Sequence, residues 1–224
     1  MNSSVLTFGA GDDQFVFSGF SGTNLTLDDM ATITPDGLLE LTNGTSNLKG
    51  HAFFPVPVSF RGLPQPELPW LGICHRTEQR PIHRAGGAVL GQLGLTNIDD
   101  DGNASNHIFA AEIDTIQNIE FQDIDNNHVG VDINGLHSLE SHPAGYYDKD
   151  GIFHAMDLIS GRVMQAWVDY GGDDAQINVT IAPIGMSKPV KPLVSATCNL
   201  KDVLMEPSFV GFSSTCNKSS TTSN

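Results

Sequence analysis

The residues best suited to chemistry lie between positions 112 and 128. Glu112 and Asp114 stand two apart in the predicted strand 108–115, so their carboxylates point to the same face. An oxygen-rich stretch follows, and His128 opens the next predicted strand. Carboxylates and amides suit a hard ion such as Ca²⁺, whereas a set that includes one imidazole suits a transition-metal ion such as Mn²⁺. The pattern predicts a divalent-metal site at a strand end.

Acidic stretches of this kind also occur in EF-hands, in glycosidases and in loops that bind no ion. An EF-hand needs glycine at its sixth loop position, but counting from Asp123 gives His128 and counting from Asp99 gives Ala104. A glycosidase would use two acids that flank the bond to be cleaved. Glu112 and Asp114 stand two residues apart on one strand, and no other acid stands out as a second catalytic residue. A solvated acidic loop without any ion stays an open alternative.

Composition narrows the class of protein. The chain has 224 residues, with 11 basic against 26 acidic side chains and a net charge of −15. This balance argues against binding to nucleic acids or to anionic membranes, and no apolar run approaches the roughly 18 residues of a membrane span. Three cysteines, Cys74, Cys198 and Cys216, exclude a disulfide scaffold, although the last two could pair.

The elements that must position the acidic stretch are predicted to be strands. Short alternating or β-branched runs are separated by turn residues, which is typical of an antiparallel all-β protein. The predicted strands cover 15–17, 24–27, 31–34, 38–42, 108–115, 129–134, 163–170, 176–182, 193–200 and 209–212. Residues 171–174 should close a hairpin. Pro55 and Pro57 predict that 51–60 is an edge strand or a crossing segment.

Signals for the cellular compartment disagree. Asn-x-Ser/Thr motifs begin at Asn2, Asn24, Asn43, Asn103, Asn178 and Asn217. About 2 or 3 would arise by chance in such a composition, so they indicate a secretory origin and glycosylation at Asn24, Asn43, Asn103 and Asn178. The first residues, however, show neither a basic region nor an apolar signal core. Either a signal peptide is missing or the chain is never exported.

Several motifs, in order along the chain, resemble the legume-type (L-type) lectin domain. The motifs are FVFSGF at 15–20, NLTL at 24–27, DGLLELTN at 36–43, NHIFAAEIDT at 106–115, NNHVGVDIN at 126–134, NVTIAP at 178–183 and VGFSST at 210–215. The resemblance spans 13–60 and 97–214 and is closest to the extracellular domain of plant lectin receptor-like kinases. It implies a concanavalin-like jelly-roll β-sandwich that binds carbohydrate and has no enzymatic activity.

The resemblance also implies adjacent Mn²⁺ and Ca²⁺ sites and a sugar site. For the ions it implies Glu112 and His128 at the transition metal, Asp114 and Asp123 at both ions, Asn118 and the backbone carbonyl of Ile116 at calcium, and Ser138 at a metal-bound water. For the sugar it implies Asn118 and a variable loop formed by Ser213, Ser214 and Thr215. The implied partner is a glycan at the cell surface or outside the cell, and the fold allows a homodimer through sheet edges.

One segment departs from the family. Residues 61–84 hold four of the chain's five arginines and four prolines, and the alternating pattern stops. The family's Gly-Leu-Ala-Phe core strand and its sugar-binding Asp are absent from 61–90. At the end of the chain, Ser, Thr and Asn residues stand where the family has a final strand that ends in a Trp-Ser pair. We therefore expect an incomplete sandwich with weak binding of monosaccharides. A degenerate lectin fold that serves structure or protein interaction, without sugar affinity, is the alternative.

A change of reading frame is a hypothesis for the origin of the atypical segment. Plausible codons for residues 68–75, read in a shifted frame, can encode Cys-His-Gly-Leu-Ala-Phe-Ala-Ile, and those for 87–91 can shift to another family-like stretch. The sequence thus predicts a domain over 13–216 with an irregular, out-of-frame stretch at 61–91. Residues 1–12 are expected to be an N-terminal extension, and 217–224 a disordered tail.

Overall fold

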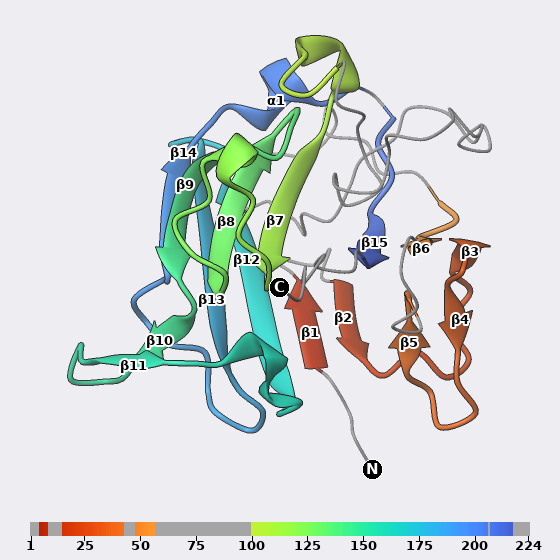
Figure 1. Ribbon diagram of the computed structural model, residues 1–224, viewed down its shortest axis with the longest axis horizontal. Coiled ribbons are helices and arrows are strands. Elements are labelled where there is room, and N and C mark those ends of the chain that lie inside the picture. The colour runs from red at the N-terminus through yellow and green to blue at the C-terminus, as the bar shows by residue number, and fades with distance from the viewer. Residues whose placement is uncertain (1–4, 9–14, 43–47, 57–99, 206, 217–224) are drawn as a thin grey trace, which may run out of the picture.

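The computed structural model describes residues 5–8, 15–42, 48–56, 100–205 and 207–216, and it confirms an all-β fold (Figure 1). The strands are β1 (Val5–Phe8), β2 (Phe15–Ser18), β3 (Thr26–Asp29), β4 (Thr32–Ile33), β5 (Leu39–Glu40), β6 (Leu48–Phe53), β7 (Phe109–Asp114), β8 (His128–Ile133), β9 (Ser138–Pro143), β10 (Gly145–Tyr147), β11 (Phe153–Ala155), β12 (Met164–Gly171), β13 (Gln176–Pro183), β14 (Val194–Thr197) and β15 (Gly211–Cys216). The helical turns are η1 (Ala104–Asn106), η2 (Ile119–Phe121), η3 (Leu158–Ser160) and α1 (Leu200–Val203).

A five-stranded sheet forms one layer, in the order β14-β13-β12-β1-β2. The predicted hairpin is confirmed, because β12 and β13 pair antiparallel from Met164 opposite Pro183 to Gly171 opposite Gln176. The boundary predicted at residue 12 needs a correction. Strand β1 lies parallel to β12 and antiparallel to β2, so Val5–Phe8 belongs to the sheet and not to an extension.

The second layer is the three-stranded sheet β7-β8-β9, and the core lies between it and the first layer. Alternate residues of β13 point inward, and Ile177, Val179 and Ile181 are almost fully buried. On β8, Val129 and Val131 are 0 % exposed and join the same cluster. The apolar face of β8 is therefore committed to the core, which leaves the opposite face of the strand for polar side chains.

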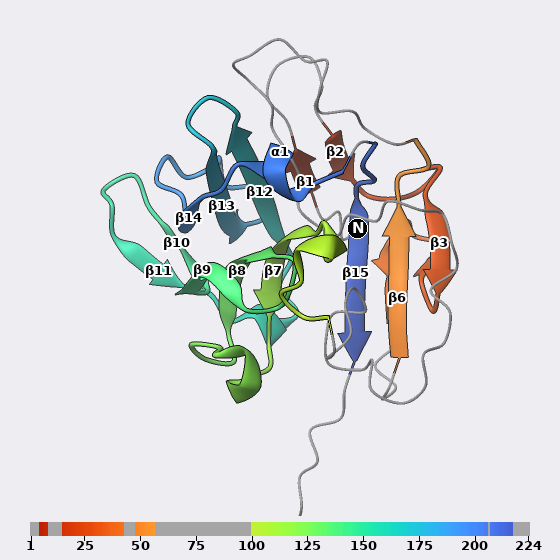
Figure 2. The ribbon, with the colours of Figure 1, turned by 90° about the horizontal axis from the view of Figure 1, so that it is seen from above.

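A third sheet, β15-β6-β3, lies beside the sandwich (Figure 2). Strand β6 pairs on both sides and ends before Pro55, so the expectation of an edge or crossing segment is wrong for residues 51–53. Ser213, Ser214 and Thr215 form part of β15, so the prediction of a loop there is also wrong. The hydroxyl of Ser213 lies 2.8 Å from Nδ1 of the buried His51, which ties β15 to β6.

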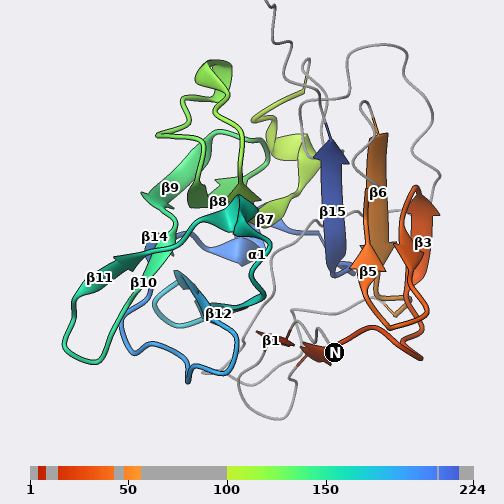
Figure 3. The same cartoon turned by 60° about the horizontal axis from the view of Figure 1, so that its bottom comes forward.

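Strands β10 and β11 form a small hairpin that projects from the sandwich (Figure 3). No strand was expected between residues 138 and 155, because the run alternates poorly and contains Pro143, Gly145 and Gly151. The aromatic residue Phe153 covers Gly145, where an added Cβ would meet its ring at 2.5 Å. Only glycine fits at this close approach of the two strands.

Some predictions fall outside the described residues. These include the atypical segment 61–91, the motif at Asn43, and the tail 217–224. Cys198 is a free, half-buried thiol. Among the described residues, no helix is long and apolar enough to cross a membrane.

Replacing Ile181 by alanine tests the core. Ile181 is 0 % exposed on β13, so Ile181→Ala should lower the free energy of unfolding by about 2–5 kcal/mol through lost burial and a cavity. Ile184, at 42 % exposed, is the matched control, and its alanine variant should lose less than about 1 kcal/mol. Chemical denaturation measures both. Equal losses would contradict the assignment of Ile181 to the core.

Candidate functional site

The polar face of the β7-β8-β9 sheet gathers the candidate site. In the antiparallel register, Asp114 lies opposite His128 and Glu112 lies opposite Gly130, so their side chains share one face. Ligand atoms of Glu112, Asp114 and His128 all lie within 4.8 Å of one another. The structure thus brings together three residues that the sequence singles out.

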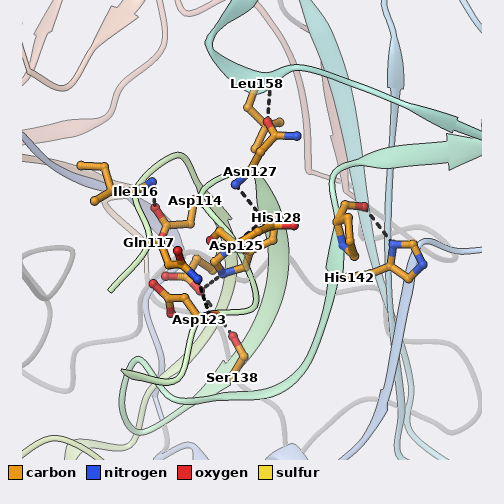
Figure 4. Close-up of polar contacts among 12 residues, drawn as sticks. Asp114, Ile116, Gln117, Asp123, Asp125, Asn127, His128, Ser138, His142 and Leu158 are labelled. Carbon is orange, nitrogen blue, oxygen red and sulfur yellow. Dashed lines mark hydrogen bonds and ion pairs between the residues drawn. The ribbon is translucent and has the colours of Figure 1, made fainter. Parts of the chain in front are cut away.

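His128 is held in an orientation that suits a metal ligand. Its Nδ1 donates to the backbone carbonyl of Asp125 at 2.9 Å, which leaves Nε2 facing the cluster, 3.6 Å from Oε2 of Glu112. Such a backbone bond is the usual device that fixes the tautomer of a metal-binding imidazole. Figure 4 shows Asp114, Asp123 and His128 turned toward one another. The site geometry therefore turns Nε2 of His128 toward the acids.

The cluster holds more carboxyl groups than positively charged groups. Glu112 is 3 % exposed and Asp132 is 0 % exposed. Burial raises the pKa of Glu112, and burial together with the charge of Glu112 raises the pKa of Asp132 well above its usual value. Burial also disfavours the charged form of His128, but its hydrogen bond and ion pair with Glu112 outweigh this and raise its pKa to about 9. The cluster is built to accept positive charge.

Asp132 is a site residue that sequence reasoning missed. Its Oδ1 accepts from the Ser138 hydroxyl at 2.7 Å, and the same hydroxyl lies 3.3 Å from Oε2 of Glu112. The other oxygen of Asp132 is buried without a hydrogen-bond partner in the described part of the chain. The available signal was the alternation of His128, Gly130 and Asp132 along one face of β8.

Gly130 leaves the space that the cluster needs. A Cβ added at this position would collide with the Ser138 hydroxyl and would lie 3.2 Å from Oε2 of Glu112. The carboxylate and the hydroxyl thus close over a bare stretch of backbone. Any side chain at this position would push the ligand atoms apart.

The loop after β7 folds back over the cluster. Its turn is fixed by the backbone N–H of Ile116, which donates to Asp114 at 2.8 Å, and by that of Asn118, which donates to Asp123 at 2.5 Å. Burial and the charge of Asp114 raise the pKa of Asp123, although its bond from Asn118 lowers it. Asp123 therefore belongs to the same electrostatic group, whereas the Asn118 side chain lies on the outer part of the loop, 3.4 Å from Glu120.

The far end of this loop is anchored by Asn127. Its Nδ2 donates to the carbonyl of Met156 and its Oδ1 accepts from the N–H of Leu158, at 2.8 and 2.9 Å (Figure 4). Its backbone carbonyl accepts from Ala144 at 2.8 Å. The residue just before His128 is therefore rigidly placed.

The glycosylation motifs differ in their surroundings. Asn24 and Asn103 are exposed, and Oδ1 of Asn103 accepts from Ser105 at the start of η1. Asn178 instead lies within β13, bonded to Ser195 at 2.6 Å, and its motif partner Thr180 is 1 % exposed. Glycosylation at each of these positions stays a prediction.

The donor set fits a divalent ion. The cluster offers several carboxylates and one imidazole, and a transition-metal ion prefers such a mixture of oxygen and nitrogen ligands. The oxygen atoms of the loop suit a harder ion beside it. The unpartnered oxygen of Asp132 supports this fit, because a buried carboxylate oxygen is costly unless a cation or a donor compensates it. Without such a partner the packed acids repel one another.

Comparison with known proteins identifies the family of this chain. The model of the legume lectin domain family matches residues 12–67 and 78–224. The unmatched residues 68–77 fall inside the atypical segment 61–91. Curated relatives include the L-type lectin-domain containing receptor kinase SIT2 of Oryza sativa subsp. japonica, 46 % identical over 92 % of this chain, and receptor kinase IV.1 of Arabidopsis thaliana, 40 % identical over 86 % of it. The chain spans about a third of the length of these relatives, at 33 % and 31 %.

Solved structures share the fold. Lectin II from Ulex europaeus superposes with a TM-score of 0.66 at 19 % identity, covering 93 % of this chain and 92 % of that one. The metal-free form of lectin I-B4 from Griffonia simplicifolia gives 0.65 at 18 % identity, covering 90 % of each chain. These likenesses confirm the jelly-roll sandwich. By its sequence match over most of its length, this chain belongs to the legume lectin domain family.

Proposed function

We propose that this chain is a carbohydrate-binding lectin domain whose acidic cluster holds a transition-metal ion beside Ca²⁺. The observation that carries the proposal is the meeting of Glu112, Asp114 and His128 within 4.8 Å, with Nδ1 of the imidazole already occupied by a backbone carbonyl. The remaining ring nitrogen, Nε2, faces the carboxylate of Glu112 and can bind an ion once its proton is displaced. The family membership supports the same conclusion.

The ligands divide by their chemistry and position. Glu112 and His128 suit the transition-metal ion, Asp114 and Asp123 can face both ions, and Asn118 with the Ile116 carbonyl suits Ca²⁺. Ser138 and the buried Asp132 stand behind the first set, where they can hold water on the ion. At neutral pH the ion must displace the proton of His128, whose pKa is about 9, so binding releases a proton.

In this proposal the ions act by ordering the loop that meets the sugar. Asp114 and Asp123 would hold the cations, whose charge would relieve the repulsion between the acids, and the Asn118 amide in the same loop would then be held ready for a sugar hydroxyl. A preorganised amide binds more tightly because less conformational entropy is lost. Ser213, Ser214 and Thr215 on β15 are proposed as further contacts. The domain would bind and not catalyse.

The biological setting follows from the relatives. We place the domain outside the cell, as the recognition part of a receptor kinase like those it resembles, with a glycan as partner and N-glycans at the exposed motifs. A homodimer through sheet edges is part of the proposal. The alternative, a degenerate lectin fold without sugar affinity, gains weight from the atypical segment at 61–91, where the family's sugar-binding Asp is expected.

Removing the ions tests the metal site. Purified protein should contain one Ca²⁺ and one Mn²⁺-like ion by elemental analysis, and chelation should lower the melting temperature, because the buried acids then repel one another. Asp114→Ala should abolish both ions. Glu140→Ala removes an exposed acid from neighbouring β9 and is the control that should keep them. Equal stability with and without chelator would count decisively against the site.

Sugar binding separates the lectin from the degenerate alternative. On a glycan array in millimolar Ca²⁺, the protein should bind, and EDTA or Asn118→Ala should remove the signal, while Asn126→Ala at an exposed loop position should not. Free monosaccharides should compete only above about 1 mM, since the acid that should oppose Asn118 is missing. An empty array would favour the degenerate module, and micromolar affinity for mannose or galactose would show that another acid has replaced the missing one.

A further inference from the structure

A pocket lies apart from the acidic cluster, between the β10–β11 hairpin and the start of β12. Its volume is about 440 Å³, within the range of about 300–1,000 Å³ that is usual for small-molecule sites. Its lining includes Tyr146, His154, Met156, Asp157, Arg162 and Met164. None of them is a proposed ligand of the metal ions or of the lectin sugar site.

One wall of the pocket is a pair of stacked rings. Tyr146 and His154 are register partners across the hairpin, and their rings are 5.1 Å apart and inclined by 17°. His154 is fixed by Asp148, which accepts from its Nε2 at 2.7 Å. On the other face of the hairpin, the ring of Tyr147 is already covered by the Lys191 ammonium at 3.4 Å. The ring pair of Tyr146 and His154 instead borders the pocket.

The pocket lining also includes two charged side chains, Arg162 and Asp157, that do not pair with each other. Arg162 is exposed, and its guanidinium makes no ion pair or hydrogen bond in the part of the chain that the structure describes. Asp157 uses Oδ1 to accept from the N–H of Ile159 at 3.2 Å, at the start of η3. A donor fork and a carboxylate acceptor thus face one pocket, and both are open to a ligand.

The segment that carries Asp157 is held by two hydrogen bonds. Asn127 bonds the carbonyl of Met156 and the N–H of Leu158, on either side of Asp157. Met156 and Met164 add an apolar lining. The pocket therefore combines a flat ring pair, an apolar lining, one cation and one acceptor on a braced segment.

We propose that this pocket binds a uronic acid residue of a glycan. The apolar C–H face of a pyranose can lie against the stacked rings, its carboxylate matches the planar fork of Arg162, and a hydroxyl can donate to Asp157. A neutral sugar leaves the guanidinium unused. An aromatic acid such as benzoate has no hydroxyl that could donate to Asp157. Its carboxylate would then lie near the carboxylate of Asp157 with no hydrogen bond to offset the repulsion.

The net charge of −15 does not prevent this binding. Charges farther away than about 8 Å are largely screened at physiological ionic strength, so the nearest groups decide. Those groups are Arg162, Asp157 and the His154–Asp148 pair, in which the negative charge already faces a hydrogen-bond donor. A ligand with a single carboxylate is favoured over a densely charged one.

Titration calorimetry of the whole chain with small glycosides tests the proposal. Methyl glucuronide should bind at least about tenfold more tightly than methyl glucoside, and benzoate should bind no better than the glucoside. Arg162→Gln should bring the two glycosides within about twofold. Lys149→Gln removes an exposed cation at the hairpin tip and should leave the preference intact. Binding should persist in EDTA, which separates this site from the metal-dependent one.

Each contrary result has a definite meaning. Absence of glucuronide binding to the unmodified protein overturns the proposal, as does a loss with Lys149→Gln equal to that with Arg162→Gln, which would indicate unspecific charge attraction. Benzoate binding as tightly as glucuronide would make this a site for aromatic acids. Loss of the binding in EDTA would assign it to the metal-dependent lectin site and leave this pocket without a ligand.

Discussion

The structure depends on a cluster of carboxyl groups that folding brings into a buried position. Glu112 and Asp132 sit at 3 % and 0 % exposure on the polar face of a sheet whose other face is core. Folding gains from packing Val129 and Val131 and at the same time brings the alternating acids together. Hydrophobic burial thus concentrates charge, and a cation is the most direct way to relieve the repulsion.

Small residues make this concentration feasible. Gly130 lets a carboxylate and a hydroxyl approach the backbone, and Gly145 lets an aromatic ring close the hairpin. In both places the side chain of a neighbouring residue occupies the space that a Cβ atom would need. In the loop after β7, two backbone N–H groups, from Ile116 and Asn118, donate to Asp114 and Asp123 and so hold the loop against the acids.

Sequence reasoning succeeded where periodicity was clean. The alternation in β12 and β13, with a Gly-Gly-Asp-Asp turn, predicted their pairing correctly, and Glu112 with His128 marked the site. It failed for Val5–Phe8, because a four-residue run shows no period until its partners are known. It also missed Asp132, since an acid in a strand looks solvent-exposed unless the covering loop is placed over it. Long-range pairing, not local preference, decided both cases.

Asn127 lies between the acidic cluster and the pocket beside the β10–β11 hairpin, and it contacts residues of both. Its backbone leads directly into His128, while its amide holds residues on both sides of Asp157. Loss of this amide would remove both hydrogen bonds that hold the segment around Asp157, and it would act at the residue that precedes His128. One substitution at position 127 would therefore disturb the order of the acidic cluster and of the pocket together, although each site would have its own ligand.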